Sequence, residues 1–245
     1  METPSDHARW LAGLEFQAES WSELGVELIP AKNGLEAAPK KIARVAATAE
    51  AQRQESLAEI AQEIANCQNC PLGKTRKCTV PGAGASQASL LFVGEAPGAE
   101  EDQQGLPFVG RSGQLLTKII ESGMGLRRQD VFLANTLKCR PPENRNPNAL
   151  ETEACRPFLD RQIALLQPRL VIALGRVAAH QLLASEAPLS KLRGIVHQRA
   201  DGLQILVTYH PSYLLREPKA KAACWQDIQL GLRHLGLAPP TPQQS

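Results

Sequence analysis

The stretch Val131-Phe-Leu-Ala-Asn135-Thr-Leu-Lys-Cys139-Arg-Pro-Pro-Glu-Asn144-Arg145 begins as an apolar run and continues as a polar loop that contains two prolines. The apolar run predicts a buried strand, so Asn135 lies where the strand gives way to the loop. In an open α/β sheet, binding sites usually lie at this end of a strand. The amide of Asn135 offers a hydrogen-bond donor beside an acceptor, and Cys139 offers a sulfur ligand. The stretch therefore predicts a recognition surface that a metal centre holds in place.

On either side of this stretch, apolar runs alternate with longer segments of helical periodicity. Three further runs predict strands at residues 90–93, 170–174 and 204–208. Apolar residues at helical spacing predict helices at residues 112–123, 152–166, 176–184 and 219–235. Strands separated by helices imply right-handed crossovers and a parallel sheet that is covered on both faces. The expected fold is three-layer α/β/α, with a central, mainly parallel four-stranded sheet.

The N-terminal region differs in character from the rest of the chain. Trp10, Leu14 and Trp21 fall on one helical face, which predicts a helical extension over residues 1–30. Such a face suits a protein partner, or docking against the main domain. Residues 1–66 carry 11 acidic and 6 basic side chains, whereas the remainder carries 14 acidic and 21 basic ones. The larger part of the chain is therefore basic and suits a polyanionic partner.

The length of 245 residues allows one full-sized domain with an appendage. Residues 31–49 have no apolar period and predict a linker. The main domain is expected over residues 50–237 and begins with a helix at residues 50–65, while residues 238–245 are expected to be disordered. No apolar run approaches the ~18 residues of a membrane span, and the first residues lack the pattern of a signal peptide. These features predict a cytoplasmic monomer without a membrane segment.

Six cysteines in a cytoplasmic protein are expected to be metal ligands or bystanders rather than disulfides. Cys67 and Cys70 form a close pair, which is hard to explain for unliganded residues, and Cys139 and Cys155 stand apart from it. Zinc ribbons usually present two close pairs, whereas an iron–sulfur cluster accepts scattered thiolates. Pro71 after Cys70 is also typical of ferredoxin-type sites. The spacing leaves iron–sulfur and zinc both open.

Polar motifs follow all four predicted strands. They are residues 94–102, residues 135–144, Gly175 and residues 210–216. Because the carboxyl ends of parallel strands meet at one edge of the sheet, we expect these motifs to form one shared site.

Taken together, four motifs resemble the family 4 uracil-DNA glycosylases: Gly94-Glu-Ala-Pro-Gly98, Gly105-Leu-Pro-Phe-Val-Gly-Arg-Ser-Gly113-Gln, Asn135 to Arg145, and His210-Pro-Ser-Tyr-Leu-Leu-Arg216. The resemblance extends from about residue 65 to residue 237. It implies the α/β/α fold of the uracil glycosylases and uracil-containing DNA, single- or double-stranded, as the partner. It also implies hydrolysis of the N-glycosidic bond, which leaves an abasic site. A four-cysteine [4Fe–4S] cluster is the implied cofactor, with Cys67, Cys70, Cys139 and Cys155 as its ligands.

The resemblance also implies a role for each residue of the pocket. Phe108 is expected to stack on the extruded base, Asn135 to hydrogen-bond the uracil edge, and Glu101 to crowd the C5 position and so exclude thymine. His210 is expected to act on uracil O2 as negative charge develops there. Without the flanking motifs each residue has a plainer explanation: a core ring, a strand-end cap, a solvated acid and a structural histidine.

Other uracil glycosylases have an aspartate that orients water where this sequence has Ala96, and family 4 likewise lacks a carboxylate there. Ala96 and Gly98 are then expected to line the base pocket. Glu95 and Asn144 are the nearest candidates to position the attacking water. The catalytic residues expected from the resemblance are thus His210, Glu95 and Asn144.

DNA contacts are expected from the residues that follow His210. Tyr213, Leu214 and Leu215 are expected to wedge into the minor groove and fill the vacated stack, with Arg216 beside them. Part of this group would be core instead, since two leucines are ordinary at the start of a helix.

Two other functions fit the same residues. One is a non-catalytic nucleic-acid-binding module that keeps an iron–sulfur or zinc centre and releases no base. The other is an adaptor in which residues 1–30 bind a protein partner and the remaining domain is secondary. Release of uracil from DNA separates the enzyme from both alternatives.

Overall fold

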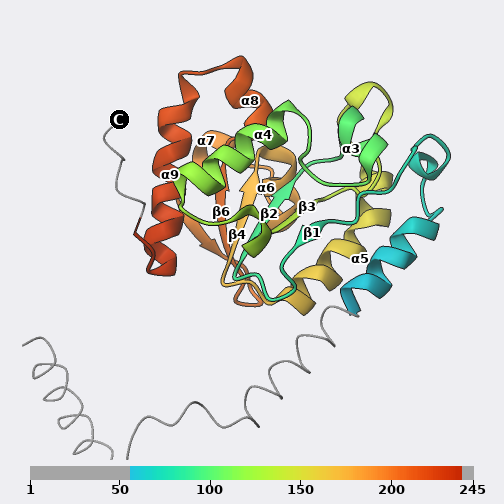
Figure 1. Cartoon of the computed structure of the whole chain (residues 1–245), viewed down its shortest axis with the longest axis horizontal. Helices are drawn as coiled ribbons and strands as arrows, with labels where there is room; N and C mark the ends of the chain where they lie inside the picture. The colour runs from blue at the N-terminus through green and yellow to red at the C-terminus, as the bar shows by residue number, and fades with distance from the viewer. Residues whose placement is uncertain (1–55, 239–245) are drawn as a thin grey trace, which may run out of the picture. The chain divides into compact units, whose positions relative to one another are not determined.

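The computed structural model describes residues 56–238 of the chain. These residues contain a six-stranded sheet in the order β1-β3-β2-β4-β6-β5 (Figure 1). The strands are β1 (Ala83–Gly84), β2 (Leu90–Gly94), β3 (Phe132–Asn135), β4 (Leu170–Leu174), β5 (Val196–Gln198) and β6 (Gln204–Thr208). The four central strands are parallel to one another, and β1 and β5 pair antiparallel at the two edges.

The mixed α/β fold predicted from the alternation of strands and helices is confirmed. The four predicted strands are the four parallel strands β2, β3, β4 and β6. The expected number of strands was wrong, because the sheet also contains β1 and β5. With two and three residues, these edge strands are too short for an alternating pattern to show in the sequence.

After β1, residues 56–238 contain the α-helices α3 (Ala99–Gln104), α4 (Arg111–Lys118), α5 (Ala149–Leu166), α6 (Arg176–Leu183), α7 (Leu189–Leu192), α8 (Pro211–Arg216) and α9 (Ala220–Leu235). Residues 56–66 are also helical. Shorter turns are η1 (Pro71–Lys74), η2 (Ile119–Gly123), η3 (Arg128–Asp130) and η4 (Pro142–Asn144). The four long helices predicted between and after the strands are present, and α3, α7 and α8 are additional short helices.

Helices cover both faces of the sheet. Successive side chains of a strand point to opposite faces, and since both sets are apolar here, each face needs a layer of helices to bury it. On one face, Ile172 of β4 packs in a core with Leu116 of α4 and Leu232 of α9. On the other face, Ala173 packs with Leu159 of α5. All five positions of β4 are buried, as expected for a central parallel strand. The sheet is therefore the middle layer between two layers of helices (Figure 1).

A third apolar cluster joins the helix of residues 56–66 to α5 and to the loop after β3. Ile60 and Ile64 of that helix pack with Phe158 of α5. An ion pair between Glu63 and Arg161 connects the same two helices at the surface. This cluster also contains the cysteines that were predicted as ligands.

Several predictions concern residues that the structure does not describe. The helical extension at residues 1–30, the linker at residues 31–49 and all but the first residue of the tail at residues 238–245 lie outside the described residues. Within residues 56–238, the helices are too short or too polar to cross a membrane.

Candidate active site

The four parallel strands end at one edge of the sheet and bring their polar loops together there. Gly94 at the end of β2 pairs with Asn135 at the end of β3, and Leu174 of β4 pairs with Thr208 of β6. A pocket of about 450 Å³ opens at this edge. Among its lining residues are ten that were predicted for the site: Glu95, Ala96, Gly98, Glu101, Phe108, Asn135, Asn144, His210, Tyr213 and Arg216. The structure thus gathers these residues from the segments at the ends of β2, β3 and β6, as the parallel sheet predicts.

One predicted DNA contact was wrong. Leu214 is 1 % exposed and packs in the core beneath α4 and α9, so it cannot enter a groove of DNA. Tyr213 and Leu215, its neighbours in α8, are each 39 % exposed. Leu215 does not line the main pocket but lies in a shallower hollow beside it, together with Arg216. The three residues differ in exposure because they lie in a short helix, which points Leu214 toward the core and its two neighbours toward solvent.

Asn135 places an unsatisfied amide oxygen at the pocket. The residue is 2 % exposed, and its Oδ1 has no hydrogen-bond partner among the described residues. A side chain at Gly94 would collide with it, since a Cβ there would lie 2.5 Å from that Oδ1 and 2.6 Å from the ring of Phe108. A buried acceptor left unpaired costs about 1–3 kcal/mol. A ligand that donates an N–H at this point would remove the penalty.

Phe108 lies in the same wall of the pocket in a constrained conformation. Its φ is 53°, in the left-handed region that residues with a side chain seldom adopt. Its ring centroid is 6.2 Å from that of His210, with the two planes tilted by 35°. Gly113 makes this arrangement possible, because a Cβ there would lie 2.0 Å from the carbonyl of Phe108. The aromatic ring and the imidazole therefore border one space.

Glu101 connects two of the loops that line the pocket. It is the third residue of α3, and its Oε2 accepts from the N–H of Gly98, 3.1 Å away. Its Oε1 accepts from the N–H groups of Val109 and Gly110, each at 2.9 Å. Since both oxygens bind backbone, the carboxylate fixes the walls of the pocket as well as lining it.

His210 caps α8 and has a defined hydrogen-bonding state. Its Nδ1 accepts from the backbone N–H of Ser212 at 3.1 Å and lies 2.8 Å from the Oγ of that residue. Burial lowers the pKa of His210 to about 4; the charge of Arg216 acts in the same direction and that of Glu101 opposes it. The imidazole is therefore neutral near pH 7. Because Nδ1 is an acceptor, the proton lies on Nε2.

The two candidates for positioning water differ in their surroundings. Burial raises the pKa of the Glu95 carboxyl, and the charge of Arg176 partly opposes this. Asn144 is exposed, has a φ of 56°, and its Oδ1 accepts from Nε of Arg140 at 2.8 Å. Both residues line the pocket. The oxygen of Asn144 is thus already engaged, whereas no described residue hydrogen-bonds to the carboxylate of Glu95.

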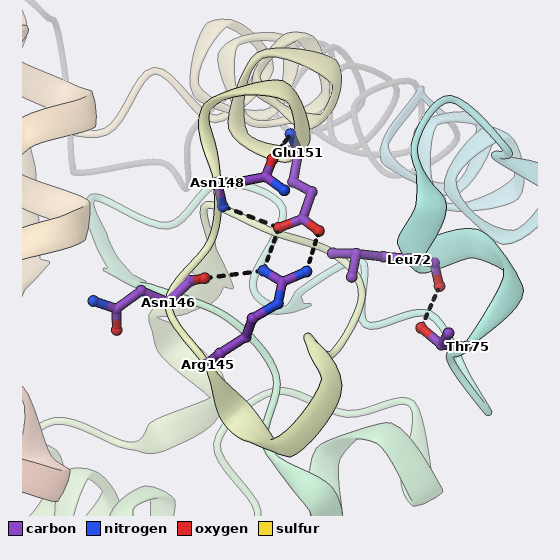
Figure 2. A network of polar contacts seen from close by, with 6 residues as sticks. All are labelled: Leu72, Thr75, Arg145, Asn146, Asn148 and Glu151. Atoms are coloured by element: carbon purple, nitrogen blue, oxygen red, sulfur yellow. Dashed lines mark hydrogen bonds and ion pairs between the residues drawn. The ribbon is translucent and has the colours of Figure 1, made fainter.

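Figure 2 shows how the loop that follows Asn144 is tied to α5. Arg145 donates two hydrogen bonds to the carboxylate of Glu151, at 2.9 Å and 2.6 Å. Glu151 is fully buried, and it also accepts from the N–H of Asn148, whose side chain caps the helix. The hydrogen bonds from Arg145 hold the pKa of Glu151 below its usual range. Sequence reasoning missed this pair, although Asn148-Ala-Leu-Glu151 has the spacing of a capping box.

The four cysteines predicted as ligands surround one small cavity of about 10 Å³: Cys67, Cys70, Cys139 and Cys155. Two hydrogen-bond donors point at their sulfurs, namely Arg76 Nη1 to Cys139 Sγ and the N–H of Lys138 to Cys155 Sγ, each at 3.3 Å. Burial raises the pKa of Cys155 to about 11, with Lys138 opposing it. Within residues 56–238, no three histidine, cysteine or acidic side chains already stand as a formed metal site. Four sulfurs around one cavity, with one guanidinium and one backbone N–H as donors to them, nevertheless fit a group that binds thiolates.

Lys138 links the cysteine cavity to the pocket, and sequence reasoning did not single it out. The side chain is 1 % exposed, and its Nζ donates to the backbone oxygen of Asn135 at 2.9 Å and to Oε1 of Gln162 at 2.7 Å. Burial lowers its pKa to about 8, and the charge of Cys155 opposes this shift. Its only signal in the sequence is its place between Asn135 and Cys139.

A parallel sheet that gathers an amide, an aromatic ring and a neutral histidine into one polar pocket suits a protein that recognises a flat polar ring. Residues 81–229 match the family model of the uracil DNA glycosylase superfamily, and this match defines the class of protein. The type-4 uracil-DNA glycosylase of Pyrobaculum aerophilum is 45 % identical over 71 % of this chain and 92 % of its own length. That of Saccharolobus solfataricus is 42 % identical over 74 % of this chain and 88 % of its own. The chain belongs to the type-4 uracil-DNA glycosylases.

The chain is also similar, at lower identity and coverage, to a type-5 uracil-DNA glycosylase. The type-5 uracil-DNA glycosylase of Thermus thermophilus is 33 % identical over 54 % of this chain and 68 % of its own length. The resemblance found in the sequence motifs is therefore confirmed at the level of the family.

Proposed function

We propose that the protein is a uracil-DNA glycosylase of base excision repair, which hydrolyses the N-glycosidic bond of uracil in DNA and leaves an abasic site. The observation that carries this proposal is the buried, unpaired Oδ1 of Asn135, a residue that lines the pocket together with Phe108. Glycosylases must move the target nucleotide out of the stack before they can reach its glycosidic bond. The pocket at the sheet edge then receives the base.

Asn135 reads the edge of the base. Uracil presents an N3–H donor beside the O4 acceptor, and the amide of Asn135 pairs with both through its Oδ1 and Nδ2. Cytosine presents the reverse order and would leave the buried amide unpaired. Phe108 stacks on the face of the base, and stacking of this kind contributes about 1–3 kcal/mol per base. Glu101, which borders the same wall, excludes a methyl group at C5.

His210 stabilises the leaving base. Cleavage of the bond gives the sugar oxocarbenium character and leaves negative charge on uracil. A hydrogen-bond donor directed at this developing charge stabilises the transition state, and this is usually the largest catalytic contribution in such a site. The neutral imidazole of His210, with its proton on Nε2, donates to uracil O2 while Ser212 holds Nδ1 in place.

Glu95 is the better candidate to position the attacking water, with Asn144 beside it. The carboxylate of Glu95 lines the pocket and is free to accept from a water, whereas the Oδ1 of Asn144 is engaged by Arg140. Ala96 leaves room in the loop but offers no group to the water. The pocket contains no lysine among its described lining residues, which supports a monofunctional glycosylase.

DNA approaches across the rim of the pocket. Arg145, Arg176 and Arg216 line its mouth and suit contacts with phosphates. Tyr213 and Leu215 are exposed on α8 beside them and suit a wedge that enters the space left by the extruded base. Tyr213 stacks on Tyr209 with ring centroids 5.1 Å apart, so its ring is held in place before DNA binds.

Cys67, Cys70, Cys139 and Cys155 are proposed to hold a [4Fe–4S] cluster. The cluster would connect three parts of the chain: the segment of Cys67 and Cys70, the loop after β3 through Cys139, and α5 through Cys155. Since hydrolysis of a glycosidic bond transfers no electrons, its contribution is structural. Zinc is the second candidate because the cysteine spacing allows it.

A uracil-release assay tests the proposal. Single- and double-stranded oligonucleotides with one uracil should lose the base, and the strand should break only after treatment with alkali. Binding of uracil-containing DNA without base release would support the non-catalytic module instead. A cytoplasmic location, a monomeric state and a protein partner for residues 1–30 remain predictions.

A further inference from the structure

The short loop between α3 and α4 contains Phe108, the residue proposed to stack on the base. The guanidinium of Arg128, which lies outside the pocket, binds the backbone of this loop. Arg128 Nη2 donates to the carbonyl oxygens of Pro107, at 2.7 Å, and Phe108, at 3.0 Å. The other arm, Nη1, donates to Oγ1 of Thr117 in α4 at 2.7 Å. One planar side chain therefore fixes two successive carbonyls of the loop against the helix that follows it.

The N–H groups of the next two residues of the same loop are bound by a second side chain. Glu101 Oε1 accepts from the N–H groups of Val109 and Gly110, as described above. The backbone between these two anchors bends at Phe108, whose φ of 53° is unfavourable for a residue with a side chain. Such a conformation persists only where the surrounding contacts determine it, and the anchors on both sides supply these contacts.

Arg128 does not belong to the base pocket. It lies on η3, directly before β3, and borders a separate hollow together with Arg127 and Glu121. It therefore touches neither the base nor the DNA rim described above. The three hydrogen bonds of its side chain lead to the loop of Phe108 or to α4 behind it, and its backbone N–H donates to Glu121.

We infer that Arg128 is a positioning residue, which holds the loop of residues 107–110 so that the Phe108 ring faces the base. Arg128 thus contributes to stacking on uracil through Phe108. The inference rests on the proposed function, because it assigns a purpose to the ring that the pocket presents.

Arg128→Met tests the inference, since methionine keeps an unbranched apolar stem and removes every donor. Arg127→Met is the matched control: the neighbouring arginine is exposed, and within residues 56–238 its side chain pairs with Asp130 in the same turn. Single-turnover excision by Arg128→Met should fall by about 10- to 100-fold, because small displacements in an active site have effects of this size. Arg127→Met should stay within about twofold of the wild type, as expected for a surface ion pair.

A double-mutant cycle separates positioning from a general loss of stability. If Arg128 acts through Phe108, then Arg128→Met should cost about twofold or less in a Phe108→Ala background, because coupled residues are not additive. Losses that simply multiply would overturn the inference, as would equal effects of Arg128→Met and Arg127→Met. Where Arg128→Met does not fold, Arg128→Lys replaces it in the cycle, since lysine cannot bind both carbonyls and Thr117 in the same fork geometry.

A crystal structure of the variant gives a readout that does not depend on activity. A displaced Phe108 ring supports the inference, and an unchanged ring overturns it. Failure of the wild type to release uracil would instead count against the proposed function. The two failures are therefore distinguishable.

Discussion

At the scale of single residues, the proposed function gives Asn135 and His210 different roles: Asn135 recognises the base, and His210 assists cleavage of the bond. Asn135 is buried at the end of β3 with an unpaired Oδ1, whereas His210 is fixed through Nδ1 and presents Nε2. The first group distinguishes uracil from cytosine in the bound state. The second acts on charge that exists only as the bond breaks, so the two should respond differently to substitution.

Asn135→Asp replaces an amide donor with a second acceptor, so it should weaken the match to uracil O4. One lost polar match costs about 1–3 kcal/mol, or roughly ten- to hundredfold in the relative rate on uracil and cytosine. His210→Ala should instead lower the single-turnover rate by about 10²–10³-fold and keep the preference for uracil. Both variants are assayed on uracil and cytosine substrates at equal metal content. Wild-type discrimination in Asn135→Asp, together with its loss in His210→Ala, would reverse the two roles.

The low pKa of His210 predicts an unusual pH dependence. An ordinary histidine titrates near pH 6.5, but this one stays neutral down to about pH 4. Excision should therefore show no loss with a midpoint near pH 6.5 as the pH falls from 8 to 5. Because the folded pKa is below the unfolded value, the stability that neutral His210 contributes is fully present above about pH 6.5 and is lost as the pH falls toward 4. Single-turnover rates and unfolding by circular dichroism across this range provide the measurements, and nitrogen NMR of the ring would show its tautomer.

Charged residues that the fold buries were the hardest to predict. Lys138 and Glu151 are 1 % and 0 % exposed, although lysine and glutamate are usually at the surface. Their partners, Gln162 and Arg145, come from a helix and a loop whose contacts only the tertiary structure defines. In contrast, Asn135 and Cys139 could be predicted because strand, loop and ligand chemistry all appear in one short stretch.

At the scale of elements, α5 contributes residues both to the cavity lined by the four cysteines and to contacts behind the pocket. Its first turn binds Arg145 through Glu151, its middle carries Cys155, and Gln162 in its second half binds Lys138. Pro157 lies inside the helix and removes one backbone donor there.

Glu151→Ala should weaken these contacts by removing a helix cap and a buried carboxylate together. The substitution removes both the helix cap and the ion pair, and together these losses should lower the free energy of unfolding by about 2 kcal/mol. The contribution of the ion pair to this figure is kept small because Arg145 is partly exposed to water. Glu153→Ala, at an exposed position in the same helix, is the control and should change it by less than about 0.5 kcal/mol. Chemical denaturation measures both. Equal stability of the two variants would show that the Arg145–Glu151 pair is dispensable.

Elements were predicted well where they are long and periodic. The sequence pattern gave the four parallel strands and the long helices, because their buried faces repeat over several turns or positions. It did not show β1, β5 or α7, which have four residues or fewer. The wrong assignment of Leu214 has the same origin, since the six residues of α8 are too few for a helical period to identify the buried face.

At the scale of the whole molecule, the cavity of the four cysteines brings together segments that are far apart in the sequence, and the proposed cluster would join them. Thiolate ligands around one cavity should give a brown protein with about four irons per chain, as a cubane cluster requires. Cys139→Ser should lose iron, whereas Cys78→Ser should retain it, because Cys78 lies outside the cavity. Elemental analysis and visible absorption provide the measurements. One zinc per chain and no iron would contradict the cluster and favour the zinc alternative.

The match to the superfamily begins at residue 81, so residues 1–50 precede the part of the chain that defines the family. Their acidic balance disfavours direct contact with DNA, which is itself an anion. Deletion of residues 1–50 should therefore leave excision of uracil from short oligonucleotides within about twofold of the full-length rate, as expected when no substrate contact is lost. The rate is compared at equal metal content, with thermal unfolding as the control for folding. The truncated protein could instead fold and keep its metal but lose most of its activity. That result would show that residues 1–50 take part in catalysis, and it would exclude a role confined to binding a protein partner.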